Sequence, residues 1–217
     1  MNKIFSILDK YVNYFIAFFI FFYSVGIFGI LTPKLSEFFI STTSFALIIS
    51  IIALIFFHRE KWNPKTLAIF ATIAVLGFFV EVIGVNTGLI FGEYIYGNTL
   101  GIKVFNTPVM IAFNWILMIY TSAAIAQRLN FHVILTILSG AFLMVIYDLL
   151  LEPVAPNLDM WTWTEASAPF QNYVAWGIIA IVFHSLLQLN HIKIQNKLAP
   201  AVYLTQFGFF LIINILS

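Results

Sequence analysis

The sequence predicts an all-α membrane protein with about seven transmembrane helices, a cytoplasmic N-terminus and two long loops on the outer side. Three observations support this fold class. Of the 217 residues, 62% are hydrophobic and 9% are charged, whereas about a quarter of the residues of a soluble domain are charged. Apolar windows of about 20 residues, the length that crosses a bilayer, recur along the chain. Lysine and arginine fall mainly on one side of those windows. We therefore expect one integral membrane domain over residues 1–217.

The apolar windows and the residues that bound them define the expected helices. The windows are 11–31, 39–57, 65–85, 108–127, 131–151, 172–190 and 200–216. Asn63-Pro64 and Thr107-Pro108 each match an N-cap followed by proline at the first helical position. Glu152-Pro153 indicates a helix end, because the residue before proline disfavours helical backbone. The first window is too long for a signal-peptide core and no small-residue cleavage site follows it, so we expect a retained span.

The cations set the orientation of these helices. With the N-terminus inside, the outer side holds only Lys34 and Lys103. The inner cations are Lys3, Lys10, Arg59, Lys61, Lys65, Arg128, Lys193 and Lys197. This asymmetry predicts a multi-pass protein with a cytoplasmic N-terminus, and we expect it in the cell membrane of a bacterium or archaeon. The net charge of +1 gives no sign of a nucleic-acid partner.

Two acids, Glu81 and Asp148, lie inside hydrophobic segments. Charged groups are costly at membrane depth, so an intramembrane acid is a candidate functional residue. The predicted orientation puts these acids in the outer half, together with Glu37, Glu93, Glu152, Asp159 and Glu165. Four of the five tryptophans gather there too: Trp115, Trp161, Trp163 and Trp176. An interfacial aromatic belt would explain the tryptophans, but it would not explain the acids.

Helix periodicity directs the acids toward the bundle interior. Glu81 shares a helix face with small residues, which mark helix–helix contact in membranes. These residues are Ala74, Gly77 and Gly84. Asp148 shares a face with Ala141 and Met144 in a weaker version of the same pattern. Counting 1.5 Å per residue places Glu81, Asn114 and Asp148 in one layer near the outer rim.

Glu152 follows Asp148 by four residues and lies on the same side of the helix. Like charges at this spacing repel, so we expect one carboxyl of the group to keep a proton near neutral pH and to act as an acid. The structural alternative is that these polar groups only hold helices together, bonded to backbone or to each other.

Two outer loops, 86–106 and 152–172, are too apolar for disorder, and loops of this length are often functional. The first carries Glu93, Tyr94 and Tyr96, and its alternating residues around Gly97-Asn98 predict a β-hairpin or a partly re-entrant lid. The second is rich in proline and aromatic residues and is expected to be irregular. Together they are expected to cover the acids and keep bulk water out, while leaving a lateral path from the lipid.

Several kinds of chemistry lack their motifs. There is no cysteine, no strand–GxGxxG–helix unit and no P-loop. The histidines show no HxxH or HxxxH spacing, which disfavours a di-iron oxygenase. They are His58, His132, His184 and His191. We therefore expect no metal and no cofactor, and proton transfer by carboxylates in an apolar pocket remains.

Four blocks resemble one family. They are EVIGVNTGLIFGEYIYGNTLG at 81–101, TPVMIAFNW at 107–115, YDLLLEPVAPNLDMWTW at 147–163 and APFQNYVAWG at 168–177. In combination they resemble the carotenoid biosynthesis protein family of integral membrane carotenoid 1,2-hydratases, which includes γ-carotene hydratase and bisanhydrobacterioruberin hydratase. The likeness covers roughly residues 75–190. Glu152 stands where the family more often has aspartate, which keeps the carboxylate, and Thr107 stands where a small apolar residue is frequent.

The resemblance implies addition of water to the terminal C1–C2 double bond of an acyclic carotenoid, giving a tertiary alcohol. We expect Asp148 or Glu81 to give the proton while the other orients water. Support is expected from Glu152, Glu93 and Asn114. The expected substrate contacts are Tyr94, Tyr96, Trp115, Tyr147, Trp161, Trp163, Asn172 and Trp176. The implied partners are the lipid bilayer, a hydrophobic carotenoid and other enzymes of the carotenoid pathway.

Two alternatives stay open at this point. A proton-initiated carotenoid or terpenoid cyclase or isomerase would use the same acid but exclude water from the cation. A carotenoid-binding scaffold or transporter would need no chemistry. A transporter is disfavoured, because the sequence shows no internal repeat and the acids lie near one face rather than at the midplane.

Overall fold

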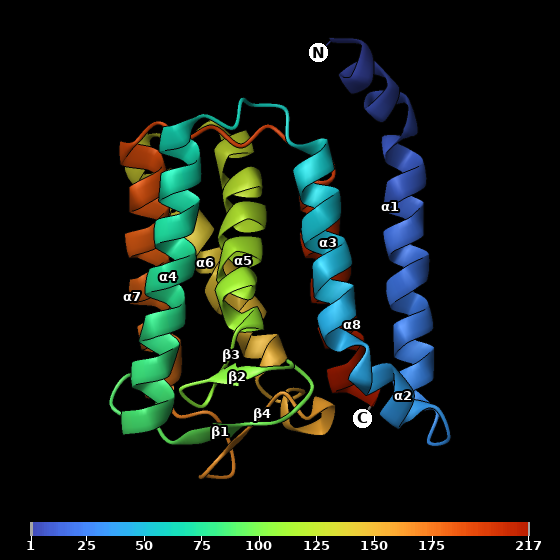
Figure 1. Cartoon of the computed structure of the whole chain (residues 1–217), viewed down its shortest axis with the longest axis vertical. Coiled ribbons are helices and arrows are strands. Elements are labelled where there is room, and N and C mark those ends of the chain that lie inside the picture. Colours follow the sequence, from blue (N-terminus) through green and yellow to red (C-terminus); the bar gives the residue numbers. More distant parts are fainter. Residues whose placement is uncertain (1, 217) are drawn as a thin grey trace.

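The computed structural model describes the backbone of residues 2–216 and the side chains of residues 8–216. The chain forms a bundle of long helices capped at one end by short strands (Figure 1). The helices are α1 (Asn2–Leu31), α2 (Ser36–Ser41), α3 (Thr43–Phe57), α4 (Pro64–Thr87), α5 (Met110–Ala126), α6 (Val133–Leu151), α7 (Phe170–Leu189) and α8 (Ala199–Leu216). The strands are β1 (Tyr94–Tyr96), β2 (Lys103–Val104), β3 (Thr107–Pro108) and β4 (Trp161–Trp163), and short 3₁₀ turns lie at Gln127–Leu129 and Pro156–Leu158.

The predicted fold class, an all-α membrane protein, is confirmed. Six of the described helices are long and apolar enough to cross a membrane, and α3 is a shorter apolar helix of 15 residues. The expected window 39–57 is divided into α2 and α3 at Thr42. The hydroxyls of Ser41, Thr42 and Thr43 donate to the carbonyls three residues earlier, and such side-chain bonds compete with the helix ladder. Lys3, one of the inner cations, lies among residues whose side chains are not described.

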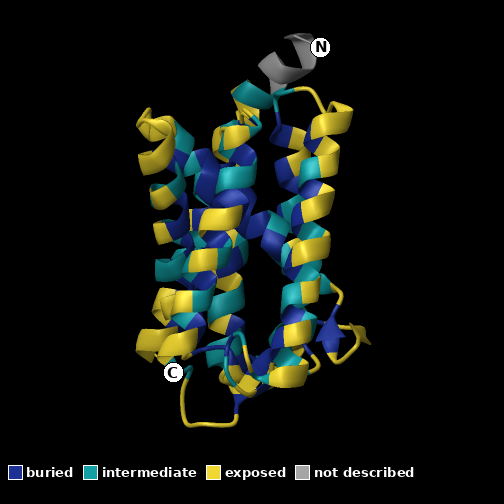
Figure 2. Ribbon diagram, turned by 90° about the vertical axis from the view of Figure 1, so that its left-hand side faces the viewer, coloured by how far each residue is buried: buried dark blue, intermediate teal, exposed yellow. Residues whose placement is uncertain are grey.

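Helix α5 lies at the centre of the bundle and is largely buried. It packs against α4, α6 and α8, while α7 packs on α6 and α1 packs on α8. A small-residue run, Thr121–Ala124, lets these neighbours approach closely. Figure 2 shows buried residues concentrated in the interior and exposed, mostly apolar ones on the flanks. An apolar exterior of this kind suits contact with lipid.

Some helix ends follow the sequence signals and one does not. Asn63 accepts a hydrogen bond from the amide of Thr66, and Pro64 opens α4 as expected. Helix α6 ends at Leu151, just before Glu152-Pro153. The expectation that Thr107-Pro108 starts a helix is wrong. These residues form β3, which pairs with β2 across Phe105 and Asn106, both at positive φ (52° and 63°), and α5 begins at Met110.

The hairpin expected around Gly97-Asn98 is also wrong. Strand β1 exists, but its partner is β4 from the second loop, 152–172, in antiparallel register Tyr94↔Trp163 and Tyr96↔Trp161. The second loop is therefore not irregular throughout. An edge bond from the amide of Gly97 to the carbonyl of Met160 (2.9 Å) extends the junction. The two loops meet as one layer across the strand end of the bundle (Figure 1).

Candidate active site

Glu81 is the centre of a buried hydrogen-bonding cluster. Its side chain is 5% exposed. Oε2 accepts the hydroxyls of Tyr94 (2.8 Å) and Tyr96 (2.6 Å), and Oε1 accepts the indole N–H of Trp115 (3.2 Å). A carboxylate is an acceptor without a donor of its own, so three donors around it suit its ionised form.

The small residues beside Glu81 explain how Trp115 reaches it. A Cβ at Gly77 would lie 2.6 Å from Cγ of Trp115, so only glycine leaves the indole its place between α4 and α5. The expected inward face of α4 is confirmed, because Gly77, Glu81 and Gly84 are all buried. Trp115 is further held by stacking on Trp176, with ring centroids 4.5 Å apart and planes at 21°.

A second acidic cluster lies at the end of α6. The side-chain amide of Asn172 donates to Asp148 Oδ2 (2.9 Å) and to Glu152 Oε1 (3.0 Å), which bridges the two acids. Glu152 Oε2 also accepts the indole N–H groups of Trp161 (3.0 Å) and Trp163 (2.7 Å). Asp148 is fully buried and its Oδ1 has no hydrogen-bond partner. The donors therefore favour charge on Glu152 rather than on Asp148.

The β1–β4 ladder supplies donors to both clusters. Strand side chains alternate, so Tyr94, Tyr96, Trp161 and Trp163 all point inward and are buried, while the residues between the members of each pair are exposed. Each cross-strand pair contains a tyrosine bound to Glu81 and a tryptophan bound to Glu152. The rings of Tyr94 and Trp163 are 5.1 Å apart, and those of Tyr96 and Trp161 are 6.1 Å apart.

A small chamber joins the two clusters. Its lining residues are Glu81, Phe91, Tyr94, Tyr96, Ile111, Asn114, Glu152, Trp161, Trp163, Asn172 and Trp176. The free space is about 20 Å³, and a polar cavity of roughly 10–15 Å³ holds one water molecule. The chamber thus places two carboxyl groups, from α4 and from the end of α6, around a space for a single water.

The electrostatics of the strand layer follow from burial. Burial raises the pKa of Glu152 above its ordinary value, and hydrogen bonds from Trp161, Trp163, Asp148 and Asn172 offset only part of this rise. Burial, followed by the charge of Glu81, raises the pKa of Tyr94 and of Tyr96. Both tyrosines therefore stay neutral hydrogen-bond donors. Among the described residues, no group of three or more His, Asp or Glu side chains is placed to hold a metal ion.

Most residues expected at the site come together, and three lie elsewhere. Asp148 does not line the chamber but lies behind it, in contact through Asn172. Glu93 is exposed, because it precedes Tyr94 and strand alternation turns it outward; it borders a separate depression near Glu165. Tyr147 is buried beside a neighbouring apolar groove.

The sequence did not reveal a polar network deeper in the bundle. Gln206 Nε2 donates to the hydroxyl of Tyr23 (2.7 Å), which is 3.1 Å from Ser50 Oγ, and Tyr147 donates to Gln206 Oε1 (3.3 Å). The network fastens α1, α3, α6 and α8 together. The sequence feature that could have indicated this network is Gln206 itself, because it places an amide within an apolar span. The chamber walls Phe91 and Ile111 carried no signal, since apolar residues are abundant here.

The fold and the chamber define an integral membrane protein with buried acids at one end of its helical bundle. The sequence model of the carotenoid biosynthesis protein family matches residues 42–217. The chain belongs to this family. The match extends beyond the blocks at 75–190 on both sides and leaves out α1 and α2. No curated protein and no solved structure matches the chain.

Proposed function

We propose that the protein adds water to the terminal C1–C2 double bond of an acyclic carotenoid and forms a tertiary alcohol. The observation that supports this reaction is the chamber, where Glu81 and Glu152 border a space sized for one water molecule. Hydration needs a proton donor, a proton acceptor and one positioned water. The two acidic clusters supply the first two groups, and the space between them suits the third.

The proton source in this proposal is the Asp148–Glu152 pair. Besides Asp148, Glu152 has three donors, whereas Asp148 has one, so the resting proton belongs on Asp148. Because Glu152 lines the chamber and Asp148 does not, the proton passes from Asp148 through Glu152 to C2 of the alkene. A tertiary cation then forms at C1. The faces of the surrounding tyrosine and tryptophan rings stabilise such a cation.

Glu81 acts in the second half of the reaction. The water oxygen forms a bond to C1, and Glu81 accepts the proton that this water releases. One proton is added at C2 and one is returned to the protein, so the net reaction is alkene plus water to alcohol. Proton transfer from Glu81 back to Asp148–Glu152 resets the site. Tyr94 and Tyr96 keep Glu81 charged and ready to accept.

Expression in a lycopene-producing host tests the reaction. Chromatography and mass spectrometry should reveal a product that has gained one or two waters, and heavy-oxygen water should label the new hydroxyl. The Glu81→Gln and Asp148→Asn variants should accumulate unchanged lycopene. A ring-containing isomer with the mass of lycopene would instead identify a cyclase, and unchanged pigment in several acyclic carotenoid backgrounds would refute enzymatic hydration.

A further inference from the structure

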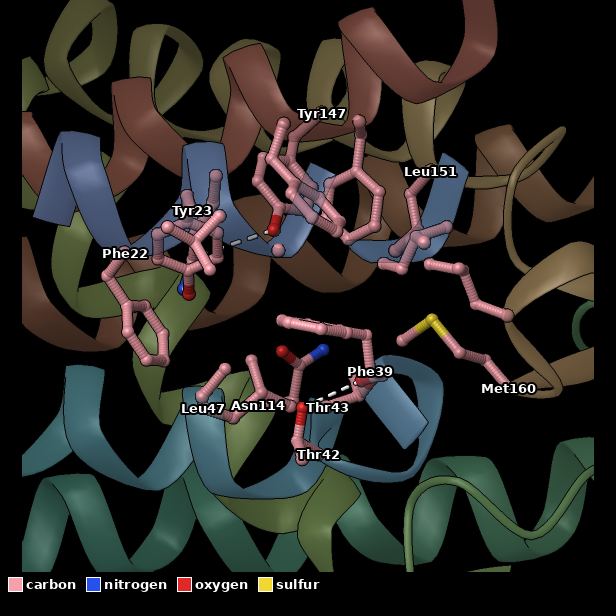
Figure 3. A pocket seen from close by; sticks show the side chains of 18 residues that line it. Phe22, Tyr23, Phe39, Thr42, Thr43, Leu47, Asn114, Tyr147, Leu151 and Met160 are labelled. Carbon is pink, nitrogen blue, oxygen red and sulfur yellow. Dashed lines mark hydrogen bonds between the residues drawn. The ribbon is translucent and has the colours of Figure 1, made fainter. Parts of the chain in front are cut away.

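An apolar groove lies next to the chamber on the side of α1 and α3. Figure 3 shows this groove, which has about 120 Å³ of free space. Its walls come from α1, α2, α3, α5, α6 and α8 and from the turn before β4. Most of the lining is hydrocarbon, with residues such as Leu47, Leu151, Met160 and Phe209. Tyr23 and Gln206, tied to each other by a hydrogen bond, lie at its deep end.

The groove and the chamber adjoin at Asn114. This half-buried residue of α5 lines both spaces. Figure 3 shows Asn114 on the same wall as Thr43 and Leu47, across the space from Tyr147 and Leu151. Leu151 and Met160 line the groove, and the residues that follow them, Glu152 and Trp161, line the chamber. A chain lying in the groove therefore has its end at the acids.

The groove also opens sideways. Helix α1 packs mainly on α8, and α3 packs on α5, so direct contact between α1 and α3 is slight. Val25, on the groove wall, is 37% exposed, and Phe39, Thr42 and Thr43 are half-buried. These partly exposed residues lie on α1, on α2 and at the start of α3, on the side of the bundle. A ligand that is itself dissolved in lipid reaches the groove without crossing water.

We propose that this groove holds the isoprenoid chain of the substrate, with the reacting end directed to Asn114, at the boundary between the groove and the chamber. This inference rests on the proposed function for the identity of the occupant. An acyclic isoprenoid chain fits because the lining is apolar, the access is lateral and the end of the groove at Asn114 adjoins the chamber that Glu81 and Glu152 line. The Tyr23–Ser50–Gln206 network closes the deep end, so the remainder of a long chain leaves between α1 and α3 into lipid.

Two glycines provide a matched test of the groove. A Cβ at Gly26 would meet only Phe209, at 3.5 Å, an ordinary contact, so a larger side chain at this position extends into the groove. A Cβ at Gly208 would meet nothing within 4 Å, and Gly208 does not line the groove. Gly26→Leu thus fills the groove, and Gly208→Leu makes the same chemical change elsewhere in a helix.

Binding is measured with lycopene as the probe. Purified protein in nanodiscs is titrated with lycopene, and quenching of tryptophan fluorescence gives the affinity. Gly26→Leu should weaken binding by at least roughly tenfold, about 1.4 kcal/mol, and Gly208→Leu should bind as the unchanged protein does. A second pair guards against misfolding of the first: Leu47→Trp, in the groove wall, should lose binding, and Ile48→Trp, 41% exposed beside it, should keep it.

The outcomes separate the groove from the reaction. Asp148→Asn should bind lycopene normally while forming no alcohol. One outcome is that no carotenoid is converted to an alcohol, while Gly26→Leu and Leu47→Trp weaken lycopene binding and their controls do not. That outcome would support the groove as the binding site and refute the hydration reaction. If both groove variants bind lycopene as tightly as their controls, or hydrate it at the full rate, the groove is not the chain-binding site.

Discussion

Gly77 leaves the space that the indole of Trp115 occupies, so Gly77→Ala should disturb the Glu81 cluster from a distance. The new Cβ would lie 2.6 Å from Cγ and 2.7 Å from Cδ1 of Trp115. The indole has to move, and its 3.2 Å bond to Glu81 is lost. Overpacking costs about 1–3 kcal/mol and a lost bond to a charged group about 1.5–3 kcal/mol. Alanine has the higher helix propensity, which stabilises the folded state by roughly 0.5–1 kcal/mol and offsets part of this loss.

The net expectation is a loss of about 2–5 kcal/mol in the free energy of unfolding. For a chain of this size, that lowers Tm by at least about 4 °C. Gly208→Ala is the control, because its Cβ meets open space, and it should be neutral or slightly stabilising. Thermal unfolding in detergent and product formation from lycopene are measured for both. Equal Tm and equal activity for the two variants would refute the packing argument.

Three further outcomes are expected. Glu152→Gln should slow alcohol formation by at least roughly 100-fold. Glu93→Gln, a change at an exposed position, should leave the rate within about twofold of the unchanged protein. Equal losses of rate in the two variants would show that the chamber is not the active site. Tyr96→Phe removes the 2.6 Å bond to Glu81 and should lower the free energy of unfolding by about 1.5–3 kcal/mol in a denaturation assay, so unchanged stability would contradict that bond. Burial lowers the pKa of His58 from 6.5 to about 4; its contribution to stability is therefore present above pH 6.5 and lost as pH falls toward 4. The Tm of His58→Gln should therefore fall less than that of the unchanged protein as pH decreases from 6.5 to 4. Identical curves of Tm against pH for the two proteins would exclude His58 as a cause of the decline.

The helical framework was predictable because local signals carry it. Asn63-Pro64 starts α4 in the structure as in the sequence, through a cap that involves neighbouring residues only. The break at Thr42 was not predictable from hydropathy, since Ser41, Thr42 and Thr43 interrupt an apolar run too briefly to change a window of about 20 residues. Their hydroxyl-to-backbone bonds decide the break.

The part of the site that lies on helices was predictable from the sequence, whereas the part that depends on the pairing of two loops was not. Periodicity placed Glu81 on the buried face of α4, because i+3 and i+4 neighbours share a face. The pairing of β1 with β4 joins segments far apart in the chain, and nothing in either segment specifies its partner or register. Period-two alternation did distinguish Glu93 from Tyr94 and Tyr96, and applying it would have turned Glu93 outward. The positioning of Asp148 behind Glu152 depends on Asn172 from another helix.

The β1–β4 ladder couples the environments of Glu81 and Glu152, because one pair of strands supplies donors to both. Its inward side chains give Glu81 two donors and Glu152 two donors. A slip of one residue turns every side chain of a strand to the opposite face. A displaced ladder would therefore remove the hydrogen bonds of both carboxylates at once and open the chamber to water. The donors of Glu81 and of Glu152 therefore form or are lost together when the strand layer forms or opens.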